Sequence, residues 1–198
     1  MFPSKGGDKL PKENKPYVVG DVDLQVFLEV TSHEALIRQA YKDSRNIWTW
    51  SNGITSASGH SVERYIDNPQ PIERCIEVSM WLLRNKYVPT VKKAFGDKFN
   101  KLTKAQFTAA LSFHWNTGGI LRASWVKSFC KGNEQLAYTQ FMNWSRPPEI
   151  IPRREKEREL FFNGKWTNDG TVLEFTRLRP NYQPDWSSGK RIDVSNMF

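Results

Sequence analysis

Three polar residues, Glu34, Asp43 and Thr49, have types and spacing that suit hydrolysis of a glycosidic bond. They form an E-x8-D-x5-T arrangement, with Glu34 expected near the end of a helix, Asp43 in a connection and Thr49 on the following strand. Glycosidic cleavage uses two carboxyl groups in unlike environments. One is kept protonated by burial and donates to the leaving oxygen, while the other supports the attacking water. A glutamate and an aspartate nine positions apart also occur by chance, so other parts of the chain must decide.

The segment DSRNIWTWSNGIT (43–55) determines what Thr49 faces. Because side chains alternate along a strand, Thr49 lies on the face opposite to Trp48 and Trp50. The pair Asn52-Gly53 suits a type I′ turn, which needs positive φ at both central residues. We therefore expect Thr49 to face a cleft and the tryptophans to pack within a small lobe. A slip of one residue would exchange the two faces.

Length and composition predict one domain, which has room for two lobes. The chain has 198 residues, of which 38% are hydrophobic, enough for a packed core. The net charge of +8 favours a polyanionic partner, which includes nucleic acid, anionic lipid and an acidic cell-wall polymer. Charge alone does not choose among these three.

The two cysteines and the N-terminus bear on the compartment. Cys75 and Cys130 fall in apolar helical patterns and are expected to be free, buried thiols, which fits a reducing cytoplasm. The first 16 residues lack the apolar region of a signal peptide, and no stretch approaches the roughly 20 apolar residues of a membrane span. We expect no stable membrane insertion.

Periodicity predicts a mostly helical α+β domain at 21–176, between an N-terminal arm at 1–20 and a polar C-terminal tail at 177–198. Residues 22–41 read as helix, interrupted near Thr31-Ser32. Further helices are expected at 71–86, from Thr103 to about 116, and at 124–131, 134–144 and 152–162. Hairpins are expected at 47–56 and 166–172.

Several kinds of site are disfavoured by the sequence. His33, His60 and His114 lack the spacing of metal ligands. The chain has no G-x-S-x-G elbow, P-loop or dinucleotide fingerprint. We expect neither a metal nor a cofactor.

Three segments resemble the phage-type lysozymes, glycoside hydrolase family 24. HEALIRQAYKDSRNIWTW (33–50) is similar to the family pattern HEG-x-R-x-x-AY-x-D-x5-T. ALSFHWNTGGI (110–120) resembles A-x-SF-x-FN-x-G, and QFMNWSRPPEIIPRREKEREL (140–160) resembles the closing F-x-x-W…RR-x-x-E-x-x-L segment. The matches occur in the family order and together span about residues 30–166. The chain departs from the family pattern in two places. Ala35 replaces a glycine in the first segment, and TWSNGIT replaces TIGYGHT from Thr49 onward.

The resemblance implies a lysozyme-like fold with a small β-hairpin lobe, a helical lobe and a peptidoglycan cleft between them. It implies Glu34 as general acid, with Asp43 and Thr49 positioning the water. It also implies that Arg153 or Arg154 lies near Glu34 and that Asn116 lies on the cleft side of the helical lobe.

The function implied by the resemblance is that of a muramidase, which cleaves the β-1,4 link between N-acetylmuramic acid and N-acetylglucosamine. Such an enzyme is expected to be monomeric, to bind glycan strands and not nucleic acid, and to serve phage-type host lysis. It would accumulate in the host cytoplasm and reach the wall through a lesion made by another protein. The alternatives are a virion-associated enzyme, a non-catalytic peptidoglycan-binding protein and, from charge and aromatic content, a nucleic-acid binder.

Overall fold

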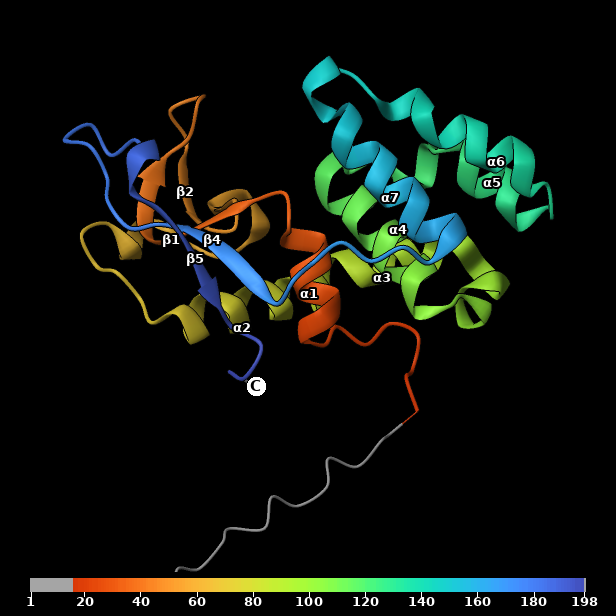
Figure 1. Ribbon diagram of the computed structural model, residues 1–198, viewed down its shortest axis with the longest axis horizontal. Coiled ribbons are helices and arrows are strands. Elements are labelled where there is room, and N and C mark those ends of the chain that lie inside the picture. The colour runs from red at the N-terminus through yellow and green to blue at the C-terminus, as the bar shows by residue number, and fades with distance from the viewer. Residues whose placement is uncertain (1–15, 198) are drawn as a thin grey trace, which may run out of the picture.

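The computed structural model describes residues 16–197 and shows two lobes with a helix between them (Figure 1). Most of the expected N-terminal arm, residues 1–15, lies outside the described residues. Residues 16–20 contact the helical lobe, where the Tyr17 ring lies 6.5 Å from that of Phe107. The boundaries expected for the domain at 21–176 stay a prediction.

The small lobe is built on a five-stranded sheet of order β3-β2-β1-β4-β5. Pairing is antiparallel except between β1 and β4, which run parallel. The strands are β1 (Ala35–Lys42), β2 (Trp48–Ser51), β3 (Ile54–Thr55), β4 (Thr171–Phe175) and β5 (Gly189–Asp193).

The helices form the second lobe and the connection to it. Helix α1 precedes the sheet, α2 leads away from it, and α3 to α7 pack together (Figure 1). Their bounds are α1 (Leu24–Thr31), α2 (Ile72–Leu82), α3 (Val88–Phe95), α4 (Lys104–Thr117), α5 (Ser124–Cys130), α6 (Glu134–Phe141) and α7 (Ile151–Asn163). The prediction of a mostly helical α+β, lysozyme-like fold is confirmed.

The prediction of helix over 22–41 is wrong in its second half, because residues 35–42 form β1. Leu36, Ile37 and Ala40 are buried at a spacing that suits a helix as well as a strand buried on both faces. Since β1 pairs with β2 on one side and β4 on the other, tertiary pairing overrides the local pattern. Glu34 therefore lies in the turn between α1 and β1 and not within a helix.

The hairpin expected at 47–56 is present as β2 and β3, but its turn differs from the prediction. Trp50 pairs with Ile54, and positive φ occurs at Ser51 (54°) and Gly53 (92°) instead of at Asn52 and Gly53. The loop thus has three residues between paired positions and is not the two-residue type I′ turn.

The helix from 72 to 95 runs between the two lobes and is irregular in the middle. Residues Leu83–Tyr87 form a π-helical turn immediately before Val88 and Pro89. Proline lacks the N–H that would continue the ladder, which accounts for the irregular turn before Pro89, although the chain stays helical beyond it.

Helices α4 to α7 follow their expected boundaries within a few residues, whereas α3 (Val88–Phe95) lies beyond the end expected at residue 86 and was not predicted. Thr103 and Gln106 form the predicted capping box at the start of α4, and Gly118 ends α4 in the left-handed region. The next residue, Gly119, lies so close to the Trp144 ring that a Cβ atom would overlap it. Buried aromatic rings fill the centre of this lobe, among them Phe113, Trp125, Phe141 and Phe161.

The C-terminal residues differ most from their prediction as a polar surface tail. Five residues of β5 pair with β4 from Thr171↔Asp193 to Phe175↔Gly189, which also replaces the hairpin expected at 166–172. Val172 and Val194 are buried, so two apolar side chains anchor an otherwise polar segment to the small lobe.

Two further predictions concern the cysteines and the membrane. Cys75 and Cys130 are free, as predicted, with Cys75 buried and Cys130 half-buried. Within residues 16–197, every helix is too short or too polar to cross a membrane.

Candidate active site

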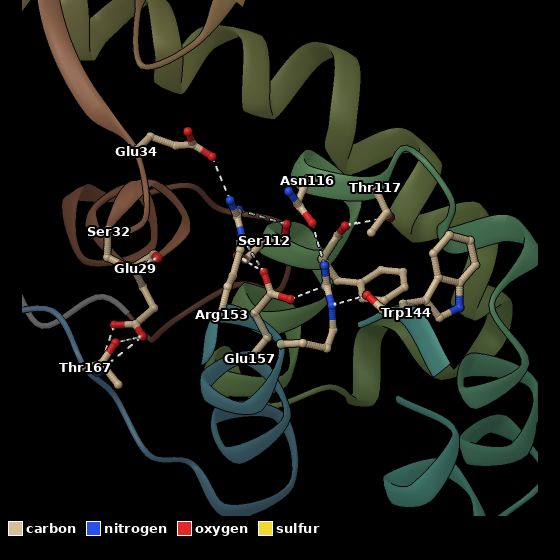
Figure 2. Close-up of polar contacts among 12 residues, drawn as sticks. Glu29, Ser32, Glu34, Ser112, Asn116, Thr117, Trp144, Arg153, Glu157 and Thr167 are labelled. Carbon is tan, nitrogen blue, oxygen red and sulfur yellow. Dashed lines mark hydrogen bonds and ion pairs between the residues drawn. The ribbon is translucent and has the colours of Figure 1, made fainter. Parts of the chain in front are cut away.

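Glu34 lies where the two lobes meet and points at an arginine of the helical lobe (Figure 2). Its backbone N–H donates to the Thr31 carbonyl, which fixes the turn after α1. Its Oε1 accepts a hydrogen bond from Arg153 Nη1 at 2.6 Å. One third of the Glu34 side chain is exposed, so the carboxyl group remains reachable from solvent.

Arg153 is held in place by buried partners on α4 and α7. Its Nε donates to Glu157 Oε1 at 2.9 Å, and Ser112 Oγ donates to the same oxygen at 2.6 Å. The Arg153 side chain is only 7% exposed. The guanidinium therefore has one fixed orientation, with Nη1 directed at Glu34.

Arg154 is the neighbouring arginine and contacts a different set of residues. It is fully buried, pairs with Glu157 Oε2 and donates to the Asn116 side-chain oxygen and the Trp144 carbonyl. The sequence left open which arginine contacts Glu34, and the structure identifies Arg153. Together Glu34, Arg153, Arg154 and Glu157 balance two negative against two positive charges.

Asn116 lies at the edge of this network, where its side-chain oxygen accepts a hydrogen bond from Arg154. Beside its bond to Arg154, it lines a cavity of about 440 Å³ on the helical lobe together with Trp144 and Arg146. Asn116 thus both supports the buried arginine and borders a surface hollow.

Asp43 follows β1 and organises the connection to β2. Its Oδ1 accepts hydrogen bonds from the backbone N–H groups of Arg45 and Ile47, both at 2.8 Å. Its Oδ2 lies 3.7 Å from the Arg45 guanidinium. Oδ1 thus takes both backbone donors, and Oδ2 has the longer contact with Arg45.

Thr49 lies on β2 directly opposite Tyr41 of β1. Its hydroxyl donates to the Ile47 carbonyl at 3.1 Å, and the residue is 3% exposed. Directly paired residues of antiparallel strands direct their side chains to the same face, so Thr49 shares a face with Tyr41. The hydroxyl oxygen keeps its capacity to accept a hydrogen bond.

Tyr41 was not singled out from the sequence, yet it links the three candidate residues. Burial raises the pKa of the Tyr41 phenol, and the negative charges of Glu34 and Asp43 raise it further. Both carboxylates are therefore close enough to act electrostatically on this ring, while Thr49 is its partner across the sheet. Tyr41 lies between Glu34 and Asp43 in the sequence, which could have drawn attention to it. The prediction of helix over 22–41 hid the fact that it lies on a strand.

His33 precedes Glu34 and is held in its neutral form. Burial lowers its pKa to about 3, and the nearby positive charges of Arg153, Lys156 and Arg154 act in the same direction. An imidazole with so low a pKa cannot serve as a general acid near neutral pH. His33 is therefore not a candidate for the proton donor at this position.

The two tryptophans of the hairpin pack away from these groups. Trp50 is fully buried and stacks on Tyr65 at 4.0 Å, and its indole N–H donates to the Arg38 carbonyl. Trp48 is half-buried and contacts Tyr182 edge-on at 5.1 Å. The expectation that both are packing residues is confirmed.

The family model named phage lysozyme matches residues 31–157. The chain belongs to the phage lysozyme family. The matched part contains Glu34, Asp43, Thr49, Arg153 and the network around Glu157. The C-terminal strands β4 and β5 lie beyond it.

A curated relative and several solved structures are similar to this member of the phage lysozyme family. The endolysin of Bacillus phage B103 is 36% identical over 81 residues, a match that spans 36% of this chain and 31% of the relative. This chain thus matches about a third of the relative's length.

The solved structures share the fold. A P22 lysozyme variant has a TM-score of 0.59 at 24% identity, and it covers 71% of this chain and 97% of its own. The endolysin of Escherichia coli O157:H7 phage FAHEc1 has a TM-score of 0.57 at 17% identity, with coverages of 74% and 96%. The muramidase domain of SpmX from Asticaccaulis excentricus has a TM-score of 0.52 at 22% identity, with coverages of 71% and 97%.

Proposed function

We propose that this protein is a muramidase that hydrolyses the β-1,4 link between N-acetylmuramic acid and N-acetylglucosamine in peptidoglycan. The observation that carries the proposal is the contact of Glu34 with Arg153 at the junction of the lobes. Glu34 and Asp43 both raise the pKa of Tyr41, which pairs with Thr49 across the sheet. A carboxyl group at such a junction, with a second carboxyl group on the neighbouring connection, has the components that glycoside hydrolysis requires.

In the proposed reaction, Glu34 first takes up a proton from solvent and then donates it to the glycosidic oxygen as the bond to the sugar carbon breaks. The electrons of that bond remain on the departing oxygen, which becomes a hydroxyl group. Proton donation leaves a negative charge on Glu34, and the Arg153 guanidinium 2.6 Å away stabilises this charge. Because Arg153 is already ordered by Glu157 and Ser112, it needs no rearrangement during the reaction.

Asp43 and Thr49 are proposed to hold the attacking water. Asp43 Oδ2 accepts one hydrogen from the water, and the Thr49 hydroxyl oxygen accepts the other. The water then attacks the sugar carbon from the face opposite to Glu34, and its proton passes to the Asp43 carboxylate. A single displacement of this kind inverts the anomeric configuration.

The biological setting belongs to the same proposal. We propose a monomeric lysis enzyme of phage type, which accumulates in the host cytoplasm and acts on the wall after a separate protein opens the membrane. The naming of a similar phage protein as an endolysin supports this setting. Glycan strands, and not nucleic acid, are the proposed partner, and the positive net charge aids approach to an acidic wall. A virion-associated enzyme is the alternative.

The test is digestion of purified peptidoglycan followed by analysis of the new ends. A muramidase releases fragments whose reducing end is N-acetylmuramic acid, and proton NMR of the first product reports its α anomer if the reaction inverts. Protein that sediments with peptidoglycan and releases no reducing ends would instead be a non-catalytic wall binder. A first product in the β form would contradict the single displacement.

A further inference from the structure

A cavity of about 380 Å³ lies directly beside Glu34, where the C-terminal segment meets α1 and α7. Its volume falls in the range of sites that hold small ligands. One wall is formed by Glu34 and the end of α1, and the other by residues 167–175 with Trp186 and Arg191. The second wall lies entirely beyond the family-matched residues 31–157.

The C-terminal wall is fixed to the rest of the molecule by specific bonds. Strand β4 pairs with β1 through Ala35↔Leu173, so it begins its pairing one residue after Glu34. The buried carboxylate of Glu29 on α1 accepts hydrogen bonds from the backbone and side chains of Thr167 and Asn168, at 2.7–3.2 Å. Figure 2 shows Thr167 against Glu29. The wall is thus an ordered part of the site.

Two cations and two anions line this cavity, namely Lys156, Arg191, Glu34 and Asp169. Lys156 of α7 is exposed and has no ion pair or side-chain hydrogen bond within residues 16–197. Arg191 donates to Thr171 Oγ1 at 2.8 Å and lies 3.7 Å from Asp169, so one acid partly neutralises it. Glu34 is already paired with Arg153. Lys156 is therefore available to bind a carboxylate of a ligand.

An exposed aromatic ring lines the same cavity as these cations. Trp186 is 63% exposed, although a large apolar side chain is normally buried. Its ring is held edge-on against Phe175 at 4.9 Å and an angle of 86°. The indole and the available ammonium group of Lys156 therefore offer an apolar contact and a charge contact within one cavity.

We propose that this cavity binds the acidic peptide stem carried by the muramic acid residue next to the bond that is cleaved. The inference rests on the proposed function, because a stem comes near Glu34 only when peptidoglycan is the substrate. Stem peptides combine free carboxylates with alanine methyl groups. Lys156 and Arg191 pair with the carboxylates, and Trp186 packs against the methyl groups and the peptide backbone.

The experiment compares glycan strands that carry stems with the same strands after an amidase has removed them. Lys156→Met and Trp186→Ala remove the charge and the ring, whereas Lys127→Met removes an exposed lysine on α5 as a matched control. For stem-bearing strands we expect KM to rise about five- to tenfold in the first two variants, with kcat unchanged. On strands without stems, we expect Lys156→Met and Trp186→Ala to have the same KM as the parent on those strands. Lys127→Met should have the parent's KM on both kinds of strand.

Equal KM values for parent and Lys156→Met on stem-bearing strands, or an equal loss on both kinds of strand, would overturn the assignment. A parent that releases no reducing ends would overturn the proposed function instead. Calorimetric titration of the full chain with free stem peptides needs no hydrolysis and measures binding to the cavity independently of catalysis. Saturable binding that Lys156→Met weakens supports the site, and absence of binding to the parent contradicts it.

Discussion

Arg153 Nη1 donates to Glu34 Oε1 at 2.6 Å, which joins two residues that are 119 positions apart in the sequence. Arg153 comes from α7 of the helical lobe, and Glu34 from the turn that leads into the sheet of the small lobe. The bond therefore spans the junction of the lobes. It gives the proposed acid a fixed direction and a counter-charge in one contact.

Arg153 and Arg154 allow the role of this contact to be separated from the stability of the fold. Each arginine pairs with one oxygen of the buried Glu157, but only Arg153 contacts Glu34. We expect Arg153→Met and Arg154→Met each to lower the free energy of unfolding by roughly 3 kcal/mol, since each leaves Glu157 short of a partner. We expect kcat to fall about 100-fold only in Arg153→Met.

Chemical denaturation and the rate of reducing-end release measure the two quantities on the same preparations. A similar fall of kcat in both variants would show that general loosening of the network, and not the Glu34 contact, sets the rate. An unchanged kcat in Arg153→Met would remove the guanidinium from the proposed reaction.

Thr49→Val tests the water-holding hydroxyl with almost no change of shape. The hydroxyl makes one hydrogen bond, to the Ile47 carbonyl, so the free energy of unfolding should change by only about 1 kcal/mol. A displaced water should lower kcat by roughly 100-fold. Thr139→Val on α6 is the control, because Thr139 also donates to a single backbone carbonyl. Full activity of Thr49→Val would show that the Thr49 hydroxyl does not hold the attacking water and that the residue only packs within its strand.

Gly119→Ala tests the close packing of the helical lobe behind Asn116. The backbone of Gly119 has φ −107°, which alanine tolerates, but the added Cβ overlaps the Trp144 ring. We expect the free energy of unfolding to fall by about 1–3 kcal/mol, as in other overpacked cores. The same substitution in a Trp144→Phe background should cost less. Equal costs in both backgrounds would mean that the ring is not the obstacle.

His33→Gln tests the neutral histidine beside Glu34. The pKa of His33 is about 3 in the folded protein and near 6.5 in the unfolded chain, so the unfolded chain binds the extra proton as pH falls from about 6.5 to 3. The free energy of unfolding of the parent should therefore decrease over this range. The glutamine side chain cannot titrate, so in the variant the free energy of unfolding should decrease less steeply over this range, by up to the contribution of one proton. Thermal unfolding at several pH values measures it, and identical slopes would refute the assignment.

The helical lobe was largely predictable because its signals are local. Thr103 and Gln106 supply their own cap, and Gly118, Gly132 and Gly164 take the positive φ that ends or follows a helix. These features depend on residues within a few positions of one another. The motif that contains Glu34, Asp43 and Thr49 could also be recognised from the sequence, because its residues lie within one short segment.

The sheet was harder to predict because its pairing is non-local. Residues 35–42 become a strand only because β2 and a strand more than 130 residues later flank them. The segment after residue 177 looks polar, since β5 exposes most of its side chains and pairs through its backbone. For the same reason the cavity formed with Trp186 and Arg191 had no signature in the sequence.

The central claim is that Glu34 donates the proton. Glu34→Gln keeps the shape of the side chain and can still accept a bond from Arg153, but it has no acidic proton to give. Glu134→Gln on α6, an exposed position, is the matched control. Measured as reducing ends released from peptidoglycan at saturating substrate, Glu34→Gln should lose at least about 100-fold in rate, while Glu134→Gln keeps the parent's rate. A Glu34→Gln variant that releases reducing ends as fast as the parent would contradict the account.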